Sequence, residues 1–296
     1  MESTGAEMSG ARAVPPLFIG GCGRSGTTLA VDLLGMHPVL SPVYETGFVL
    51  EVAQLLFSSG GLSAFMVADQ IERLMSHWSR DLPHRPHNKK EYERYWHGAH
   101  YVLFDRDTAM AATGTLIEDL ITAEPQAGFR RFVTGLFADH ARRDGKPAWI
   151  NKTPLYVLHL PLLKHLFPAM KFIHCTRDPR DAVPSMLSRR WGQHQTVDEG
   201  ASFWQSCIEA ARAFAARWPT DHVETRFEDL VTQPETEIAR ILQALGLEDC
   251  SADMLSRFRD RVRFDSGRIA SLERDPAVSA RIEAIAGPTM IPLGYR

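Results

Sequence analysis

The chain has 296 residues, of which 44% are hydrophobic, so it is long enough to bury a substantial core. Its formal net charge of −3 excludes a broad non-specific hold on nucleic acid or on an anionic membrane, and any anion site must therefore be local. The isolated cysteines Cys22, Cys175, Cys207 and Cys250 argue against a zinc site or a disulfide framework and favour a reducing compartment.

The first residues, 1–14, are small and polar, and we expect them to form a disordered tail without the apolar stretch of a signal sequence. No window of the chain approaches the roughly 20 apolar residues of a membrane span. We therefore expect a cytoplasmic protein without a membrane or nucleic-acid partner, with residues 15–296 forming one domain. The oligomeric state stays open, and a homodimer is one option.

The first core element is a buried strand predicted at 17–20, followed by a glycine-rich turn and a helix from Thr27 to the stop at Gly35. The turn has P-loop spacing, but Thr27-Thr28 stand where a nucleotide triphosphatase carries Lys followed by Ser or Thr. A triphosphate needs that lysine together with Mg²⁺. The loop therefore favours a compact 5′-phosphate bound without a metal, and the expected ligands are Gly23, Arg24, Ser25, Gly26, Thr27 and Thr28.

A second strand is predicted at 40–44 and delivers Glu45 at its carboxyl end, where open α/β sheets place their ligands. Residues from about 48 to 145 differ from this pattern, and we interpret them as an inserted helical lobe. Its helix-like stretches are 49–57, 65–78 and 116–143, and a polar run rich in histidine and aromatic residues occupies 81–107.

The histidines of the insert have no acidic or cysteine partner at convincing ligand spacing, so we predict no metal site. These histidines are His77, His84, His87, His97 and His100. The aromatic residues nearby either line a ligand pocket or pack a small core of the insert. They are Tyr92, Tyr95, Trp96 and Tyr101.

The core resumes after the insert with alternating strands and helices. Strands are predicted at 148–152, 171–176 and 222–226, and helices at 155–166, 182–190, 203–217 and 234–245. Such alternation predicts a mostly parallel sheet with helices on both faces. The expected fold is therefore a three-layer α/β/α arrangement of the P-loop-like type.

A second anion site is predicted after the strand at 171–176. Arg177 lies at the end of this strand, and Ser185 and Arg189 share one face of the following helix. A guanidinium, a hydroxyl and a second guanidinium that converge on one point suit a dianionic phosphate. The segment by itself would also fit a solvated charged turn.

Together, the two anion segments resemble the sulfotransferases that use 3′-phosphoadenosine-5′-phosphosulfate (PAPS). In that family a P-loop-like element binds the 5′-phosphosulfate, and a strand-end arginine with a downstream serine binds the 3′-phosphate. Residues 24–28 match the first element, and Arg177 with Ser185 matches the second. Within the family, the chain is most similar to the branch of tyrosylprotein sulfotransferases and related bacterial enzymes.

The resemblance implies roles for further residues. Glu45 falls where the branch carries its catalytic glutamate, and Lys152 matches a lysine near the transferring group. Arg189 matches a further ligand of the 3′-phosphate. Phe227 replaces a tyrosine beside the nucleotide, and a weaker match across a gap places Ser266 and Arg268 at the 3′-phosphate site.

The implied reaction is in-line transfer of a sulfuryl group to an acceptor hydroxyl without a metal. Glu45 would be the general base, with His37 as the alternative, and Lys152 and Arg24 would stabilise charge on the departing adenosine 3′,5′-bisphosphate (PAP). The tyrosylprotein branch carries an arginine that helps to hold an acidic peptide where this chain has Gly47. The expected acceptor, facing the insert, is therefore a small molecule or carbohydrate rather than a protein tyrosine.

Two alternatives stay open. A P-loop nucleotide kinase-like phosphotransferase would rest on the loop alone, and both the absent lysine and the lack of an acidic residue at the end of strand 171–176 argue against it. A non-catalytic nucleotide-binding protein would keep the fold, but the presence of both Glu45 and Lys152 argues against it.

Overall fold

The computed structural model describes residues 14–58, 62–79, 103–122, 124–189, 192, 195–261 and 274–295. Several sequence predictions lie outside these residues and stay predictions. They concern the tail before Val14, the histidines at 84, 87, 97 and 100, the aromatic residues at 92, 95, 96 and 101, and the proposed ligands Ser266 and Arg268.

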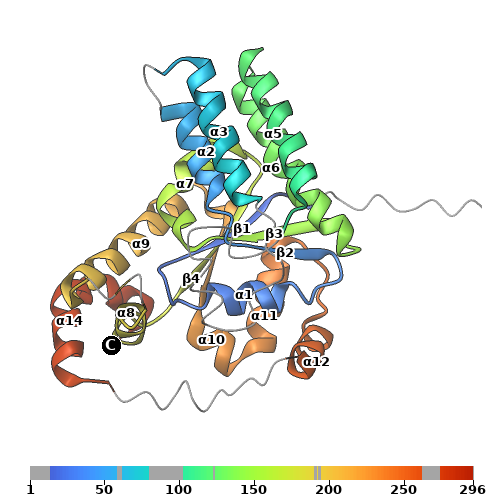
Figure 1. The fold of residues 1–296 in the computed structure, drawn as a ribbon. Helices are drawn as coiled ribbons and strands as arrows, with labels where there is room; N and C mark the ends of the chain where they lie inside the picture. Colours follow the sequence, from blue (N-terminus) through green and yellow to red (C-terminus); the bar gives the residue numbers. More distant parts are fainter. Residues whose placement is uncertain are drawn as a thin grey trace, which may run out of the picture.

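A five-stranded parallel sheet forms the centre of the molecule, with the strand order β2-β3-β1-β4-β5 (Figure 1). The strands are β1 (Leu17–Gly20), β2 (Leu40–Tyr44), β3 (Ala148–Lys152), β4 (Lys171–Thr176) and β5 (His222–Arg226). All five coincide with predicted strands. They are mostly buried, as expected for a parallel sheet that is covered on both faces.

Helices cover both faces of the sheet, which confirms the predicted fold class (Figure 1). One face packs against α1 (Thr27–Leu34), α11 (Pro234–Leu245) and α12 (Ser251–Arg261). The other packs against α2 (Phe48–Ser58), α3 (Ala64–Trp78), α5 (Arg106–Ile121), α6 (Pro125–Arg143), α7 (Leu160–Leu166), α8 (Pro179–Leu187), α9 (Val197–Arg217) and α14 (Pro276–Met290). Shorter elements are α10 (Phe227–Thr232) and the 3₁₀ turns η1 (Pro154–His159), η2 (Pro219–Asp221) and η3 (Ile291–Leu293).

The insert supplies two helix pairs, α2–α3 and α5–α6, which project together from the sheet (Figure 1). The prediction of one helix over 116–143 is wrong, because the end of α5 and the whole of α6 occupy this range. α5 ends at Ile121, and Pro125 opens α6. Proline suits the first turn of a helix, because its missing N–H would have no intrahelical partner there. Inside a helix it breaks the hydrogen-bond pattern, so α5 does not continue through Pro125.

Three other helix boundaries differ from the prediction for local reasons. The helix predicted from 155 opens as the 3₁₀ turn η1. α8 begins at Pro179, after Asp178, whose side chain caps it, and it ends at Leu187. α9 begins at Val197, before the predicted start, because Thr196 and Glu199 form a capping box.

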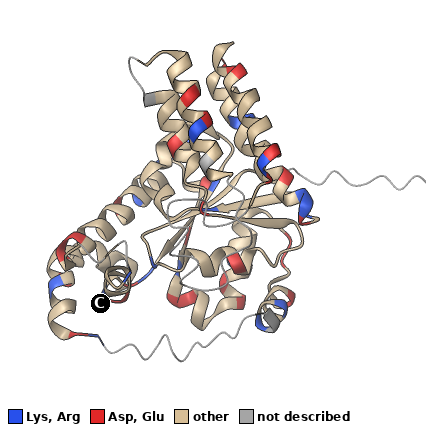
Figure 2. Ribbon diagram, viewed as in Figure 1, with Lys and Arg blue, Asp and Glu red and all other residues tan. Residues whose placement is uncertain are grey.

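Acidic and basic residues are interspersed along the helices in the view of Figure 2, as expected for a protein whose anion site is local. Within the described ranges, each helix is too short or too polar to cross a bilayer.

Candidate active site

The residues predicted to bind and react lie along one edge of the sheet, at the carboxyl ends of its five strands. In spatial order these ends carry Glu45 after β2, Lys152 in β3, the glycine-rich loop after β1, Arg177 after β4 and Phe227 after β5. Parallel strands present all their carboxyl ends at the same edge. Residues far apart in the chain therefore form one continuous row.

The loops after β1 and β4 separate at the centre of this row. β1 leads into α1 on one face of the sheet, whereas its neighbour β4 leads into α8 on the opposite face. Such a point, where adjacent connections diverge, creates the crevice in which open α/β sheets bind their ligands.

The glycine-rich loop requires its glycines for close packing. A Cβ on Gly21 would lie 2.2 Å from the carbonyl oxygen of Cys175, and one on Gly26 would lie 2.5 Å from Cδ2 of Phe227. Gly26 also has a φ of 85°. It is the N-cap residue of α1 and has no side chain that could accept hydrogen bonds from the first N–H groups of the helix. The N–H groups of the first turn of α1 are thus available to an anion.

Arg24 and Arg177 converge across the crevice. The Arg24 Nε donates to Ser185 Oγ at 3.1 Å, and the Arg177 Nη1 donates to the backbone oxygen of Arg24 at 3.4 Å. The Arg177 guanidinium lies 4.4 Å from the centre of the Phe227 ring. The structure therefore brings four predicted ligands together, Arg24, Arg177, Ser185 and Phe227.

The remaining described ligands of the prediction surround this group. Ser25 and Thr27 are buried, Gly23 is half-buried, and Thr28 and Arg189 are exposed. Burial, followed by the positive charges of Arg189 and Arg177, lowers the pKa of Arg24. Burial likewise lowers the pKa of Arg177. Guanidiniums crowded in this way favour an anion between them.

Two buried polar atoms of the crevice have no hydrogen-bond partner among the described residues, Ser25 Oγ and Arg177 Nε. Buried polar atoms are nearly always paired in native proteins, so unpaired ones call for a bound group. Both atoms can donate a hydrogen bond, as a phosphate oxygen requires. The donor set therefore fits a phosphorylated ligand.

Glu45 and Lys152 form an ion pair beside the crevice. The Lys152 Nζ lies 2.5 Å from Oε1 of Glu45; the lysine side chain is 0% exposed and the glutamate side chain 31% exposed. The Glu45 N–H also donates to the Lys152 backbone oxygen at 2.6 Å. A buried ammonium and a partly accessible carboxylate thus face one another at the ends of adjacent strands.

Backbone strain is concentrated at the predicted catalytic residues. Among the non-glycine residues that the structure describes, only Arg24 and Glu45 have positive φ angles, 69° and 44°. Residues with side chains avoid this left-handed region, and a structure that retains such strain commonly does so at a functional site.

A buried network holds the backbone just after Glu45. The Thr46 N–H donates to Thr153 Oγ1, and its hydroxyl donates to Asn151 Oδ1, each at 3.1 Å. The Tyr156 hydroxyl lies 3.1 Å from Thr46 Oγ1. Sequence reasoning missed the positioning contacts of Thr46 and Tyr156, although polar residues on both sides of Lys152 were a usable signal.

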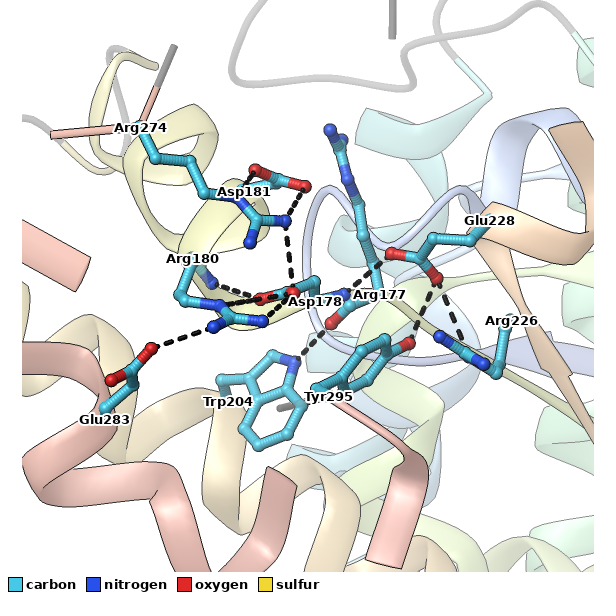
Figure 3. Close-up of polar contacts among 10 residues, drawn as sticks. All are labelled: Arg177, Asp178, Arg180, Asp181, Trp204, Arg226, Glu228, Arg274, Glu283 and Tyr295. Atoms are coloured by element: carbon cyan, nitrogen blue, oxygen red, sulfur yellow. Dashed lines mark hydrogen bonds and ion pairs between the residues drawn. The ribbon is translucent and has the colours of Figure 1, made fainter. Parts of the chain in front are cut away.

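A second network holds the loop that carries Arg177 (Figure 3). The Trp204 Nε1 donates to the Arg177 backbone oxygen at 3.0 Å, and the Asp178 N–H donates to Glu228 Oε1 at 2.9 Å. The Tyr295 hydroxyl donates to Glu228 Oε2 at 3.1 Å. Trp204 and Tyr295 were not predicted, because nothing local in the sequence indicates that α9 and the C-terminal segment return to this loop.

His37, the alternative base, lies in the turn after α1. Its Nδ1 accepts from the Val39 N–H at 3.2 Å, and its Nε2 lies 3.2 Å from the backbone oxygen of Glu248. The residue is 2% exposed. These contacts give His37 a structural role in the turn.

One group of potential metal ligands occurs in the described part of the chain: His174, His222 and Glu224, with candidate atoms within 4.8 Å of one another. His174 Nδ1 lies 3.2 Å from Glu224 Oε2, so these two already form a hydrogen-bonded pair between β4 and β5. Burial lowers the pKa of His222 to about 4. The group lies within the strands rather than beside Glu45.

Comparison with known proteins gives a family match over most of the chain. A model of the sulfotransferase family matches residues 15–251. Protein-tyrosine sulfotransferase A of Caenorhabditis elegans is 25% identical over 244 residues, which cover 80% of this chain and 51% of that protein. The omega-hydroxy-beta-dihydromenaquinone-9 sulfotransferase Stf3 of Mycobacterium bovis is 31% identical over 115 residues, 34% of this chain and 29% of that protein. The chain spans less than two thirds of the length of these curated relatives.

Solved structures share the fold. A sulfotransferase domain from the curacin biosynthetic pathway aligns with a TM-score of 0.53 at 16% identity, covering 94% of this chain and 98% of that one. The sulfotransferase STF9 of Mycobacterium avium aligns with a TM-score of 0.52 at 13% identity, covering 96% and 78%.

Proposed function

Since the chain belongs to the sulfotransferase family, we propose that it transfers a sulfuryl group from PAPS to an acceptor hydroxyl. The observation that carries this proposal is the convergence of Arg24, Arg177 and Ser185 next to the Glu45–Lys152 pair. Residues 15–296 would act as one domain, with the insert at about 48–145 on the acceptor side. The free, buried thiols of Cys22, Cys175 and Cys207 support a cytoplasmic location.

The crevice would hold PAPS through its two phosphate-bearing ends. The N–H groups at the start of α1, with Ser25, Thr27 and Thr28, would bind the 5′-phosphosulfate. The 3′-phosphate would bind Arg177, Ser185 and Arg189. Phe227, which contacts Gly26 and Arg177, would lie beside the nucleotide. Ser266 and Arg268 stay predicted ligands of the 3′-phosphate.

PAPS supplies a sulfuryl group whose bond to the phosphate oxygen breaks with loss of PAP. Glu45 would remove the proton of the acceptor hydroxyl while the acceptor oxygen forms its bond to sulfur. The electron pair of the broken bond leaves with PAP, and Lys152 and Arg24 would stabilise the resulting negative charge. These two cations supply the electrostatic assistance of the step, so it calls for no metal ion.

The acceptor is proposed to be a hydroxyl of a small molecule or a carbohydrate, with protein tyrosine as the alternative. The C. elegans relative is described as acting on protein tyrosine and the M. bovis relative on a menaquinone derivative. Gly47 favours the first choice, because it offers no charge with which to hold an acidic peptide.

Calorimetric titration with PAP, 5′-AMP and Mg-ATP tests the donor site on the wild-type protein, Arg177→Ala and the control Arg142→Ala. Arg142 is exposed on α6 and pairs with Asp139. We expect a strong preference for PAP that Arg177→Ala reduces by about tenfold or more, as for the loss of a charged hydrogen bond. Arg142→Ala should bind as the wild type does.

Equal or tighter binding of Mg-ATP would overturn the proposal and favour a P-loop kinase. Binding of PAP that is unaffected by Arg177→Ala would remove Arg177 from the site. Sulfation from labelled PAPS, measured with the wild type and Glu45→Ala, then separates an enzyme from a protein that only binds the nucleotide.

A further inference from the structure

A narrow cavity adjoins Glu45. Phe48 of α2, Met75 and Trp78 of α3, and Leu103 and Phe104 before α5 line it together with Glu45. Its free volume is about 10 Å³. This is room for about one water molecule, or for one hydroxyl group with the carbon that carries it entering from outside.

The wall of the cavity is a cluster of aromatic rings. The ring centres of Phe48 and Trp78 lie 5.8 Å apart, and those of Phe48 and Phe104 lie 6.0 Å apart, both in edge-to-face arrangements. Phe48 is buried, whereas Trp78 and Phe104 are half-buried. Both outer rings therefore keep part of their surface accessible, as contact with an apolar ligand would require.

Glu45 is the one charged residue among the described residues that line the cavity. The Glu45 carboxylate already pairs with Lys152, so the lining residues that the structure describes offer no further cation to an anionic acceptor. An apolar acceptor would instead lose water against the rings, which is favourable, and leave only its hydroxyl to be paired.

The absence of a side chain at position 47 lets Trp78 pack closely against the backbone there. A Cβ on Gly47 would lie 3.3 Å from Cζ2 of Trp78, so the indole packs directly on the backbone that follows Glu45. Thr46, between them, is held by Thr153 and Asn151. The carboxylate thus projects from, and the indole packs against, a stretch of backbone that buried hydrogen bonds hold in place.

We propose that this cavity is the acceptor seat and that the acceptor is an uncharged alcohol or phenol with an apolar body. The inference rests on the proposed function. The acceptor hydroxyl points toward Glu45, and Trp78 and Phe104 pack against the carbon atoms of the acceptor that follow it. Trp78 is then a specificity-determining residue: it favours apolar acceptors over sugars and acidic peptides.

The test is transfer from labelled PAPS to four probes: β-naphthol, n-octanol, N-acetylglucosamine and an acidic tyrosine-containing peptide. Each is used with the wild type, Trp78→Ala and the control Trp218→Ala. Trp218 is also half-buried but follows α9, where it packs on Phe214. We expect kcat/KM to be highest for the two apolar probes. Trp78→Ala should raise their KM by about tenfold or more, in line with the loss of one apolar contact surface, and PAP affinity should stay at the wild-type value.

Titration with PAP distinguishes the two ways of failing. A wild-type protein that does not bind PAP contradicts the proposed function itself. A protein that binds PAP but prefers the sugar or the peptide, sulfates none of the apolar probes, or keeps its KM in Trp78→Ala contradicts the acceptor seat alone.

Discussion

The ammonium of Lys152 lies 2.5 Å from the carboxylate of Glu45, although the two residues are 107 positions apart in the chain. They meet because β2 and β3 are parallel neighbours whose register aligns Tyr44 with Lys152. The pair is asymmetric, since the lysine side chain is fully buried and the glutamate is partly accessible. Its two members should therefore respond differently to substitution.

Glu45→Gln should lower kcat by about 10²- to 10⁴-fold, because the amide keeps the shape of the carboxylate but cannot accept the acceptor proton. PAP affinity should change by less than about twofold, since Glu45 lies outside the predicted phosphate ligands. Steady-state kinetics and titration with PAP measure the two quantities. The exposed Glu118 of α5 provides the control Glu118→Gln. An equal loss in the control, or an unchanged kcat in Glu45→Gln, would contradict the role of Glu45.

Lys152→Met should separate activity from stability. Methionine fills the buried volume without a charge, and the released Glu45 carboxylate can be hydrated, so the free energy of unfolding should change by less than about 1 kcal/mol. Glu45→Gln leaves the ammonium buried without its anion and should cost more, about 1–3 kcal/mol. Urea unfolding of both variants tests this order.

Activity should fall in Lys152→Met by about 10²-fold or more, because a cation near the leaving oxygen is lost. The reverse order of stabilities would mean that the lysine is solvated in the free protein. Near wild-type turnover in Lys152→Met would remove it from the charge-stabilising role.

The sheet and the glycine-rich loop were predictable because their determinants are local. Residues 17–20 form a short apolar run before a turn, and 171–176 carry Phe172, Ile173 and Cys175 before a polar turn, as is typical of buried parallel strands. The loop glycines indicate a sharp turn because glycine adopts backbone conformations that other residues avoid. The break between α5 and α6 was missed because apolar residues continue across the turn at helical spacing.

The catalytic pair and its surroundings were less accessible to local reasoning. Glu45 and Lys152 were singled out through a family resemblance and their places at strand ends, not through any pattern that links them. The packing of Trp78 on Gly47 and the hydrogen bond from Tyr295 to Glu228 join segments distant in the chain. Such contacts depend on how the helices pack, which hydrophobic periodicity does not specify.

Gly26→Ala should abolish most PAP binding and destabilise the protein, because the added methyl group would have to displace the Phe227 ring at a residue with φ of 85°. Gly246→Ala is the matched control: its φ is 74°, but no atom lies within 4 Å of the added Cβ. In both variants the free energy of unfolding should fall by about 1 kcal/mol, because alanine is strained in the left-handed conformation. We expect the additional loss, and an affinity at least about tenfold lower, only in Gly26→Ala, as measured by thermal unfolding and titration with PAP. Equal behaviour of the two would show that Phe227 yields freely.

His222 should make the protein less stable as the pH falls from about 6.5 to 4. Its pKa in the folded protein is lowered to about 4, mainly by burial and also by the neighbouring His174. Between these values the unfolded chain binds a proton that the folded chain does not, so acidification favours unfolding by about 3 kcal/mol at most. Glu224, whose pKa is lowered chiefly by its hydrogen bond with His174, acts in the same direction at lower pH.

The variant His222→Phe isolates this contribution. Phenylalanine keeps an aromatic ring beside Phe214, whose ring centre lies 6.3 Å from that of His222, but it binds no proton. The free energy of unfolding, measured with urea at pH 7.5 and pH 5, should therefore fall less in the variant than in the wild type. His165→Gln, at an exposed position of α7, should leave the wild-type slope unchanged. If stability falls equally with pH in His222→Phe and in the wild type, other groups cause the acid sensitivity. Glu224 would be the first to test, because its carboxylate pairs with His174 and stops stabilising the folded protein once it is protonated.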